Sequence, residues 1–141
     1  MVINFNPKYI PGDIVYNHNK EIIRITSSYL KGTKLFYYRD GNYGWIREDA
    51  IKPIPLTPEI LEKNGWDKEE KDGSVFSLSE AFMGGDEDDE DNYTCFQLYY
   101  QNKKDGWVID MRGEPLKFEI HYIHELQHFL FGLGINHEME V

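Results

Sequence analysis

The chain has 141 residues, enough for one domain or two very small ones. Its 40% hydrophobic content, with ten Tyr, eight Phe and three Trp, is typical of a folded protein and excludes a disordered one. A single cysteine, Cys95, excludes a disulfide framework and a cysteine-rich zinc site. We find no basic leader segment and no apolar run of the roughly 18 residues that a membrane helix needs, which predicts a cytoplasmic protein.

The formal net charge of −10 is unevenly distributed. Residues 1–56 carry eight basic and five acidic residues, whereas residues 57–141 carry seven basic and twenty acidic ones. Six of the acidic residues form one run, Asp86 to Asp91, which lacks the glycine and the final glutamate of an EF-hand loop and is expected to be a solvated loop. The overall charge argues against binding a nucleic-acid backbone, and we expect no nucleic-acid duplex as a partner.

Residues 9–54 alternate short β-branched or aromatic runs with turn residues. Such a pattern predicts four or five short strands, over residues 9–16, 21–26, 34–38 and 45–47, with a short helical turn and a closing strand over residues 48–54. A small barrel suits such strands because closure removes exposed sheet edges. The Pro11-Gly12-Asp13-Ile14-Val15 entry and the exit from Trp45 to Ile54 resemble SH3-like barrels. We therefore expect residues 1–54 to form a small SH3-like β-barrel.

Residues 55–141 are predicted to form a second, α+β unit. Thr57 as the N-cap, Pro58 at the first helical position and Gly65 after the last turn predict a helix over residues 57–64. Strands are expected from residue 75, over 93–101 and over 107–111, followed by an amphipathic helix over residues 119–132. The result is an α-β-β-β-α unit with an antiparallel sheet packed by both helices, so the whole chain is α+β. The apolar side of the last helix is expected to anchor this unit through Ile123, Leu126, Leu130 and Leu133.

The last helix also contains His124-Glu125-Leu126-Gln127-His128, which matches the H-E-x-x-H pattern of zinc peptidases. Two His one turn apart can hold Zn²⁺, and the Glu can deprotonate a metal-bound water. The longer form of the motif needs a glycine and a histidine where Phe131 and Gly134 stand, so a third ligand is missing. On a helical wheel His121, His124 and His128 lie almost opposite the apolar residues. We therefore expect a polar surface stripe and no enzyme, and we keep a zinc hydrolase with His124 and His128 as ligands and Glu125 as base as an alternative.

A different signal lies in the first unit, where arginines are interleaved with aromatic residues. Arginine offers planar donors for phosphate, and Tyr and Trp offer flat faces on which a base can stack. The expected ligand-binding residues are Arg24, Tyr37, Tyr38, Arg39, Tyr43, Trp45 and Arg47. The alternative is that these aromatic side chains fill the core of a small barrel and the arginines are solvated. Cys95, inside a predicted strand, is expected to be a small buried apolar residue.

The segment Pro55-Leu56-Thr57-Pro58-Glu59-Ile60-Leu61-Glu62-Lys63-Asn64-Gly65-Trp66, together with Tyr122-Ile123-His124-Glu125-Leu126-Gln127-His128, resembles a group of uncharacterised small proteins encoded by phages and mobile elements of gut bacteria. The resemblance covers roughly residues 53–135. It implies an accessory protein, and one strategy of such proteins is to sequester host defence signals, often small nucleotides.

We therefore predict a non-enzymatic binding protein without a cofactor that sequesters a small anionic, nucleotide-like ligand, and we leave a homo-oligomer open. A protein–protein interaction module, whose acidic surface engages a host protein, is the alternative. The zinc hydrolase is the second alternative.

Overall fold

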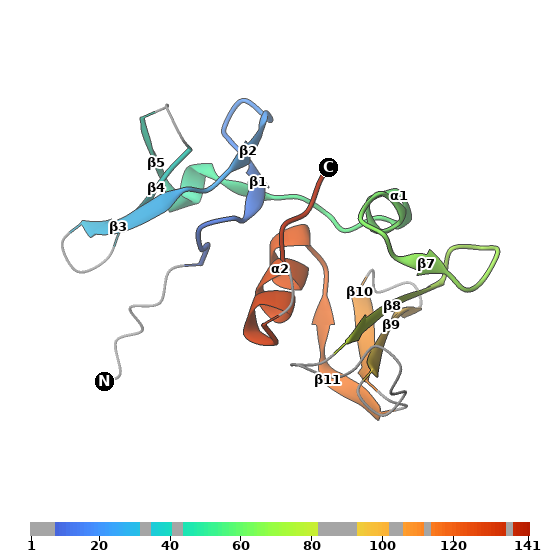
Figure 1. Cartoon of the computed structure of the whole chain (residues 1–141). Coiled ribbons are helices and arrows are strands. Elements are labelled where there is room, and N and C mark those ends of the chain that lie inside the picture. The colour runs from blue at the N-terminus through green and yellow to red at the C-terminus, as the bar shows by residue number, and fades with distance from the viewer. Residues whose placement is uncertain are drawn as a thin grey trace. The chain divides into compact units, whose positions relative to one another are not determined.

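A computed structural model describes residues 8–31, 35–40, 44–81, 93–101, 106–111, 114–134 and 137–141. The chain forms two compact units (Figure 1). The first unit combines Met1–Pro55 with Tyr122–Met139, and the second combines Leu56–His121 with Glu140–Val141. The boundary near residue 54 is close to the expected one, but the last helix belongs to the first unit and not to the second. Each unit is described by itself.

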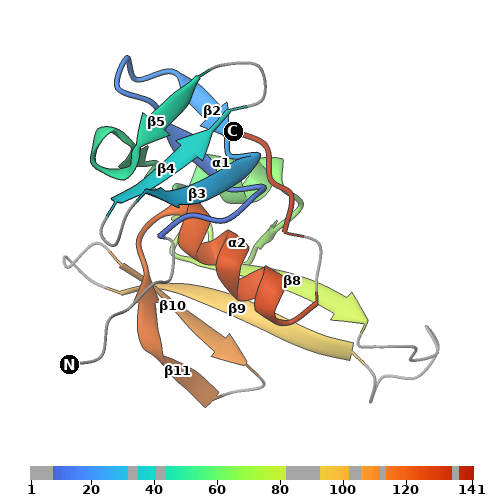
Figure 2. The ribbon, with the colours of Figure 1, turned by 90° about the vertical axis from the view of Figure 1, so that its left-hand side faces the viewer.

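The first unit contains two three-stranded antiparallel sheets. One has the order β2-β1-β6 and is built from β1 (Ile14–Tyr16), β2 (Ile22–Arg24) and β6 (Lys52–Pro53). The other has the order β3-β4-β5 and is built from β3 (Ser27–Lys31), β4 (Leu35–Arg39) and β5 (Trp45–Arg47). The strands of this second sheet lie side by side in Figure 2. A single 3-10 turn, η1 (Glu48–Ala50), follows β5 and leads towards β6.

The chain passes from one sheet to the other at two neighbouring residues. The backbone N–H of Ile25 donates to the carbonyl of Asp13 at 2.8 Å, whereas the N–H of Thr26 donates to the carbonyl of Arg39 at 2.8 Å. The described strands thus form two separate sheets, and no closed barrel is found among them. The SH3-like barrel stays a prediction, while the mixed, mostly β architecture of the chain is confirmed.

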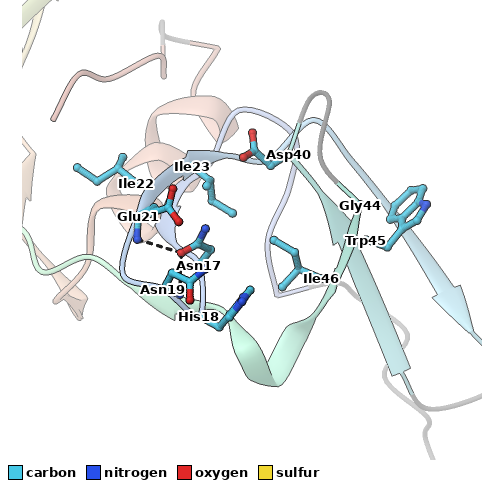
Figure 3. Close-up of a pocket in the computed structure, with 10 residues that line it drawn as sticks. All are labelled: Asn17, His18, Asn19, Glu21, Ile22, Ile23, Asp40, Gly44, Trp45 and Ile46. Atoms are coloured by element: carbon cyan, nitrogen blue, oxygen red, sulfur yellow. Dashed lines mark hydrogen bonds between the residues drawn. The ribbon is translucent and has the colours of Figure 1, made fainter.

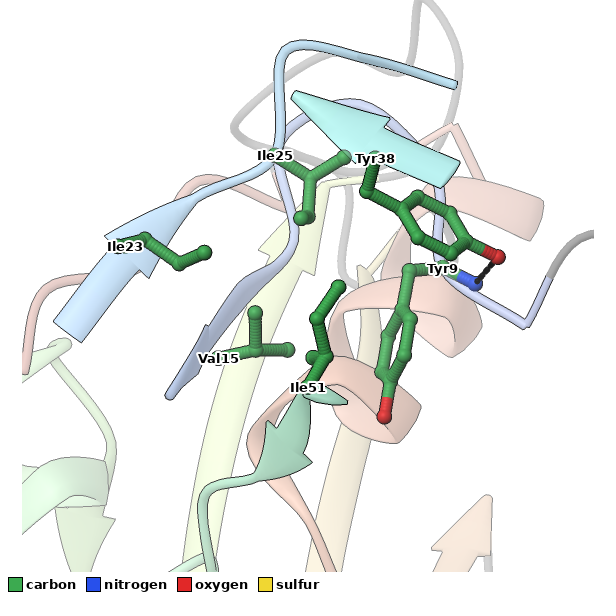
Figure 4. Packing of buried hydrophobic residues seen from close by; sticks show 6 residues of the cluster. All are labelled: Tyr9, Val15, Ile23, Ile25, Tyr38 and Ile51. Atoms are coloured by element: carbon green, nitrogen blue, oxygen red, sulfur yellow. Dashed lines mark hydrogen bonds between the residues drawn. The ribbon is translucent and has the colours of Figure 1, made fainter. Parts of the chain in front are cut away.

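Side chains from both sheets share one core (Figure 4). Its buried members are Tyr9, Val15, Ile23, Ile25, Tyr38 and Ile51. The rings of Tyr9 and Tyr38 meet edge to face, with centroids 5.3 Å apart. Burying apolar side chains of this size stabilises a fold by about 1.5–3 kcal/mol each, so these six residues hold the two sheets together.

Helix α2 (Ile123–Gly132) begins four residues later than the sequence predicts. The preceding strand, β11 (Glu114–Ile120), extends through residues that the pattern assigned to the helix. The backbone N–H of Tyr122 donates to the Glu125 carboxylate at 3.0 Å, which caps the first turn. Glu125 at the third helical position is the sequence signal that marks this start.

The amide of Gln127 ties α2 to the strand region of the first unit. Its oxygen accepts from the N–H of Ile14 at 3.0 Å, and its nitrogen donates to the carbonyls of Gly12 at 2.9 Å and His137 at 3.0 Å. Gln127 is completely buried, so all three bonds replace hydrogen bonds to water. This amide makes α2 part of the first unit, whereas the amphipathic pattern suggested packing on the second half of the chain.

The second unit is a five-stranded antiparallel meander with one helix. The sheet order is β11-β10-β9-β8-β7, and its strands besides β11 are β7 (Asp67–Lys68), β8 (Val75–Ala81), β9 (Tyr93–Gln101) and β10 (Gly106–Met111). Helix α1 (Pro58–Lys63) confirms the prediction from its caps, since the Thr57 hydroxyl accepts from the N–H of Ile60 and Gly65 adopts a φ of +85°. Of the two helices in the described parts of the chain, neither has the length and apolarity to cross a membrane.

We expect the Gln127→Leu substitution to lower the free energy of unfolding by about 2–4 kcal/mol. It leaves the Ile14 N–H and two carbonyls without partners in a buried position, at about 1–3 kcal/mol for each group that finds no water. Urea denaturation followed by circular dichroism measures the change. Phe131→Leu on the same helix is the control, because Phe131 is 57% exposed and its replacement should change stability by about 0.5 kcal/mol or less. Equal stabilities of the two variants would contradict the role given to Gln127.

Candidate functional site

The sheet β3-β4-β5 has two chemically different faces. On β4, Tyr38 points into the core and Phe36 packs against it, so Tyr37 and Arg39 point to the opposite side. Tyr37 lies opposite Tyr29 on β3, and Arg39 lies opposite Trp45 on β5. Strand alternation places six aromatic and basic residues on this outer side, and we call them the aromatic face: Tyr29, Lys31, Tyr37, Arg39, Trp45 and Arg47.

Three aromatic rings of this face contact one another. Tyr29 and Tyr37 are stacked, with centroids 5.2 Å apart and planes 12° from parallel. Trp45 meets Tyr29 edge on, with centroids 4.6 Å apart. Trp45 is 43% and Tyr29 39% exposed, and Figure 3 shows the Trp45 ring pointing away from Ile23 and Ile46. Large exposed rings that are held by their neighbours form a surface on which a flat ligand can stack at low cost in conformational entropy.

Cationic groups border these rings. The guanidinium of Arg39 lies 5.9 Å from the Trp45 ring centroid, and the Lys31 ammonium lies 5.8 Å from that of Tyr37. Neither cation has an ion-pair partner among the residues that the structure describes. Arg47 instead pairs with Asp49 at 2.6 Å. Arg39 and Lys31 are thus the two cations of this face that pair with no carboxylate of the described residues.

The structure brings together four of the seven predicted binding residues: Tyr37, Arg39, Trp45 and Arg47. Tyr38 lies in the core because it alternates with Tyr37 and Arg39 along β4. Arg24 lies on β2 of the other sheet, and its side chain donates to the carbonyl of Met139 at 3.2 Å. Tyr43 lies outside the described residues.

Sequence reasoning missed two members of the aromatic face. It assigned no strand to residues 27–31, although Tyr29 and Lys31 are spaced two residues apart, as strand neighbours on one face should be. The prediction ends the preceding strand at Thr26 and places a turn at residues 31–33, which leaves residues 27–30 without an assignment. The change of sheet at Ile25 and Thr26 explains the error, since one continuous extended segment supplies a strand to each sheet.

A cavity of about 440 Å³ opens between the β1–β2 turn and β5 (Figure 3). Its lining includes the carboxylates of Glu21 and Asp40, the His18 imidazole and an apolar wall of Ile23 and Ile46. Two carboxylates without a lysine or arginine in the lining repel an anion. The cavity therefore does not fit a phosphate-bearing ligand, whereas the aromatic face does.

The residues of the His-Glu-Leu-Gln-His segment have structural contacts. Glu125 caps the helix, Gln127 makes the three bonds described above, and Nε2 of His128 lies 2.6 Å from Oδ2 of Asp13. His124 is only 5% exposed and packs against the Tyr9 ring, with centroids 4.9 Å apart. The predicted polar surface stripe is therefore wrong at His124, because residues 8–13 cover this side of the helix.

The zinc hypothesis for the same segment requires a third ligand close to His124 and His128. Within the described parts of the chain, no three His, Cys, Asp or Glu side chains come together in a way that could hold a metal ion. His121 lies in the second unit, 3.1 Å from the Glu119 carboxylate. The zinc hydrolase stays an untested alternative.

Three buried polar atoms around α2 have no hydrogen-bond partner in the described structure: Tyr9 Oη, Asp13 Oδ1 and His124 Nδ1. Burial, followed by the charges of Glu48 and Asp13, raises the pKa of Tyr9 to about 12. Burial, followed by the charges of His128 and Lys8, lowers the pKa of His124 to about 4. Tyr9 and His124 are therefore both neutral at pH 7, and protonation of the buried His124 in acid should destabilise the fold.

Two predictions concern residues that the structure does not describe. The acidic run from Asp86 to Asp91 lies outside the described residues. The backbone of Cys95 lies in β9, opposite Ser79, but its side chain is not described. The solvated loop and the buried cysteine stay predictions.

Comparison of the chain with known protein families, characterised proteins and solved structures finds no match. The geometry of the aromatic face therefore carries the functional argument.

We expect acid to destabilise the protein through His124. The folded state holds this imidazole neutral down to about pH 4, whereas the unfolded chain protonates it near pH 6.5. The unfolded state thus binds more protons between these values, and the free energy of unfolding falls by about 3 kcal/mol as the pH falls through the window. Denaturant titrations at pH 4 and pH 7 measure this loss, which should be smaller by about that amount in His124→Phe. The exposed His18→Gln variant is the control and should retain the wild-type dependence; an unchanged dependence in His124→Phe would refute the assignment.

Proposed function

We propose that the protein is a non-enzymatic binding protein whose aromatic face holds a nucleotide-like ligand. A base stacks on Trp45, and the phosphate pairs with Arg39. The observation that carries the proposal is the position of these two side chains, directly opposite each other on β4 and β5 and both on the exposed side of the sheet.

The two contacts differ in kind and support each other. Directly opposed residues of an antiparallel pair have Cβ atoms about 4.5–5.5 Å apart, so one small ligand can reach both. Stacking of a base on an aromatic ring contributes about 1–3 kcal/mol. A guanidinium donates charge-assisted, bidentate hydrogen bonds to phosphate. Arg39 already lies over the Trp45 ring, so only its side chain must turn when a phosphate arrives.

The charge of the two units agrees with a local anion site. The first unit contains eight basic and seven acidic residues, and the second contains seven basic and eighteen acidic ones. The net charge of the first unit is therefore +1 and that of the second −11. An anion is thus attracted by the nearby cations of the aromatic face and not by the protein as a whole, which implies a modest affinity that falls with salt.

Sequestration of a host defence nucleotide, as the resemblance to phage and mobile-element accessory proteins implies, is a specific form of this proposal. An SH3-like arrangement of the first unit is also part of this proposal, because two short sheets on a common core would present one sheet face as a binding surface.

A protein–protein interaction module is the second candidate function. The cavity lined by Glu21 and Asp40, with the 53% exposed Ile22 at its edge, favours a basic segment of a partner there.

Binding of adenosine 5′-monophosphate, measured by calorimetry at low salt, tests the proposal. We expect Trp45→Ala to weaken binding by about 5- to 100-fold, the equivalent of one lost stacking contact, and Arg39→Ala to weaken it by about tenfold or more. Phe131→Ala removes an exposed ring elsewhere and Lys52→Ala an exposed cation of the other sheet, so both controls should bind as the wild type does. Binding that survives both aromatic-face substitutions would exclude this site.

A further inference from the structure

We infer that the natural ligand of the aromatic face is a single-stranded nucleic-acid segment of several nucleotides. This inference rests on the proposed function and narrows it from nucleotides in general to a strand. Three features of the face favour it: its length, its openness and the number of its ring surfaces.

Lys31 and Arg39, which have no ion-pair partner in the described part of the chain, lie at opposite ends of the face. Lys31 is opposite Leu35 at one end of the β3–β4 pair, and Arg39 is opposite Ser27 at the other. Four residue steps at about 3.3 Å separate the two ends, which is about 13 Å along the strands. A single nucleotide has its phosphate at one end and can neutralise one of these cations, whereas a strand carries a phosphate for each.

The rings lie between the two cations and provide more than one surface for stacking. Trp45 stands next to Arg39, and the stacked pair of Tyr29 and Tyr37 follows towards Lys31. Unpaired bases can lie side by side on such rings, and every base has a face that stacks, so the surface tolerates different sequences. A duplex offers no such contact, because its base faces are covered by neighbouring base pairs.

The face is open to solvent, which favours a strand over a small ligand that needs an enclosing pocket. Trp45 and Tyr29 are about two-fifths exposed, so a ligand on them is contacted from one side only. One-sided contacts give a mononucleotide little affinity, and a strand gains affinity by repeating them. Arg47 adds a third cation beside the same rings, partly offset by Asp49.

The number of cations predicts a salt dependence. Each phosphate that a single strand neutralises contributes a slope of about −0.7 to the logarithm of the binding constant against the logarithm of the salt concentration. Lys31 and Arg39 together give a slope of about −1.4, and Arg47 extends it to about −2.1. A duplex-binding surface with six or more phosphate contacts would have a much steeper slope.

The test compares adenosine 5′-monophosphate with the octaribonucleotide A8 and with a DNA hairpin duplex, using the full chain and the fluorescence of its tryptophans. We expect A8 to bind at least about fiftyfold more tightly than the monophosphate, more than the roughly eightfold gain that eight equivalent positions would give, with a salt slope between about −1.4 and −2.1. The hairpin duplex should bind at least about tenfold more weakly than A8.

Two variants separate this inference from the proposed function. Lys31→Gln should weaken A8 binding by about tenfold but monophosphate binding by less than about twofold, because the phosphate of a single nucleotide pairs with Arg39 and Lys31 only adds to the general attraction. Trp45→Ala should weaken both ligands. Lys52→Gln is the charge-matched control and should change neither. If A8 gains no more than the statistical factor, or if Lys31→Gln does not affect it, the strand inference is wrong while the nucleotide site stands. If Trp45→Ala changes neither ligand, the proposed function itself is wrong.

Discussion

The orientation of β4 depends on Tyr38. This side chain is completely buried, and its hydroxyl donates to the Glu48 carboxylate at 2.5 Å while it accepts from the N–H of Tyr9 at 3.3 Å. Burial and the bond to Glu48 raise the pKa of Tyr38 well above its usual value, so the hydroxyl keeps its proton and remains a donor. Because side chains alternate along a strand, a slip by one residue would bury Tyr37 and Arg39 and expose Tyr38. The core contact of Tyr38 therefore determines which residues form the aromatic face.

The segment that matches the zinc-peptidase pattern also joins the two parts of a discontinuous unit. Helix α2 is separated from β1 by more than a hundred residues and is nevertheless part of the same compact unit. The polar residues of the segment make the contacts that hold α2 in this unit. Glu125 caps the helix, Gln127 forms hydrogen bonds with the β1 region, and His128 pairs with Asp13. His124 fills space against Tyr9 as a neutral ring. The five residues have the spacing of a catalytic motif, and their observed contacts stabilise the fold.

Local signals predicted the local structure well. Both ends of α1 were predicted from residues with strong positional preferences. Thr57 caps the N-terminus, and Gly65 adopts the left-handed conformation after the C-terminus, as the sequence indicates. The sequence could have predicted that Tyr37 and Arg39 share one face, and that Trp45 and Arg47 share one face. Each pair is two residues apart along its strand. Tyr38 was misassigned because alternation shows that neighbours point in opposite directions without showing which side is buried.

Non-local contacts explain the remaining errors. A helical wheel describes the faces of α2 but not what covers them. His124 lies opposite the apolar residues on the wheel, yet Tyr9 from the start of the chain packs against it, and the bond between the Ile14 N–H and Gln127 is equally non-local. Burial of such polar groups becomes favourable only once those partners are in place. The same applies to β3, which was missed because the extended segment before it changes sheets at Ile25 and Thr26.

The central claim is that ligand binds where Trp45 and Arg39 meet. The chain has three tryptophans, and two of them, Trp66 and Trp107, are buried in the second unit at 4% and 2% exposure. The three indole N–H signals in a two-dimensional nitrogen–proton spectrum therefore form an internal comparison during titration with A8. The account predicts that the Trp45 signal shifts in a saturable manner while those of Trp66 and Trp107 stay in place. A saturable shift of Trp66 or Trp107 with Trp45 unmoved, or no shift of any of the three, would contradict it.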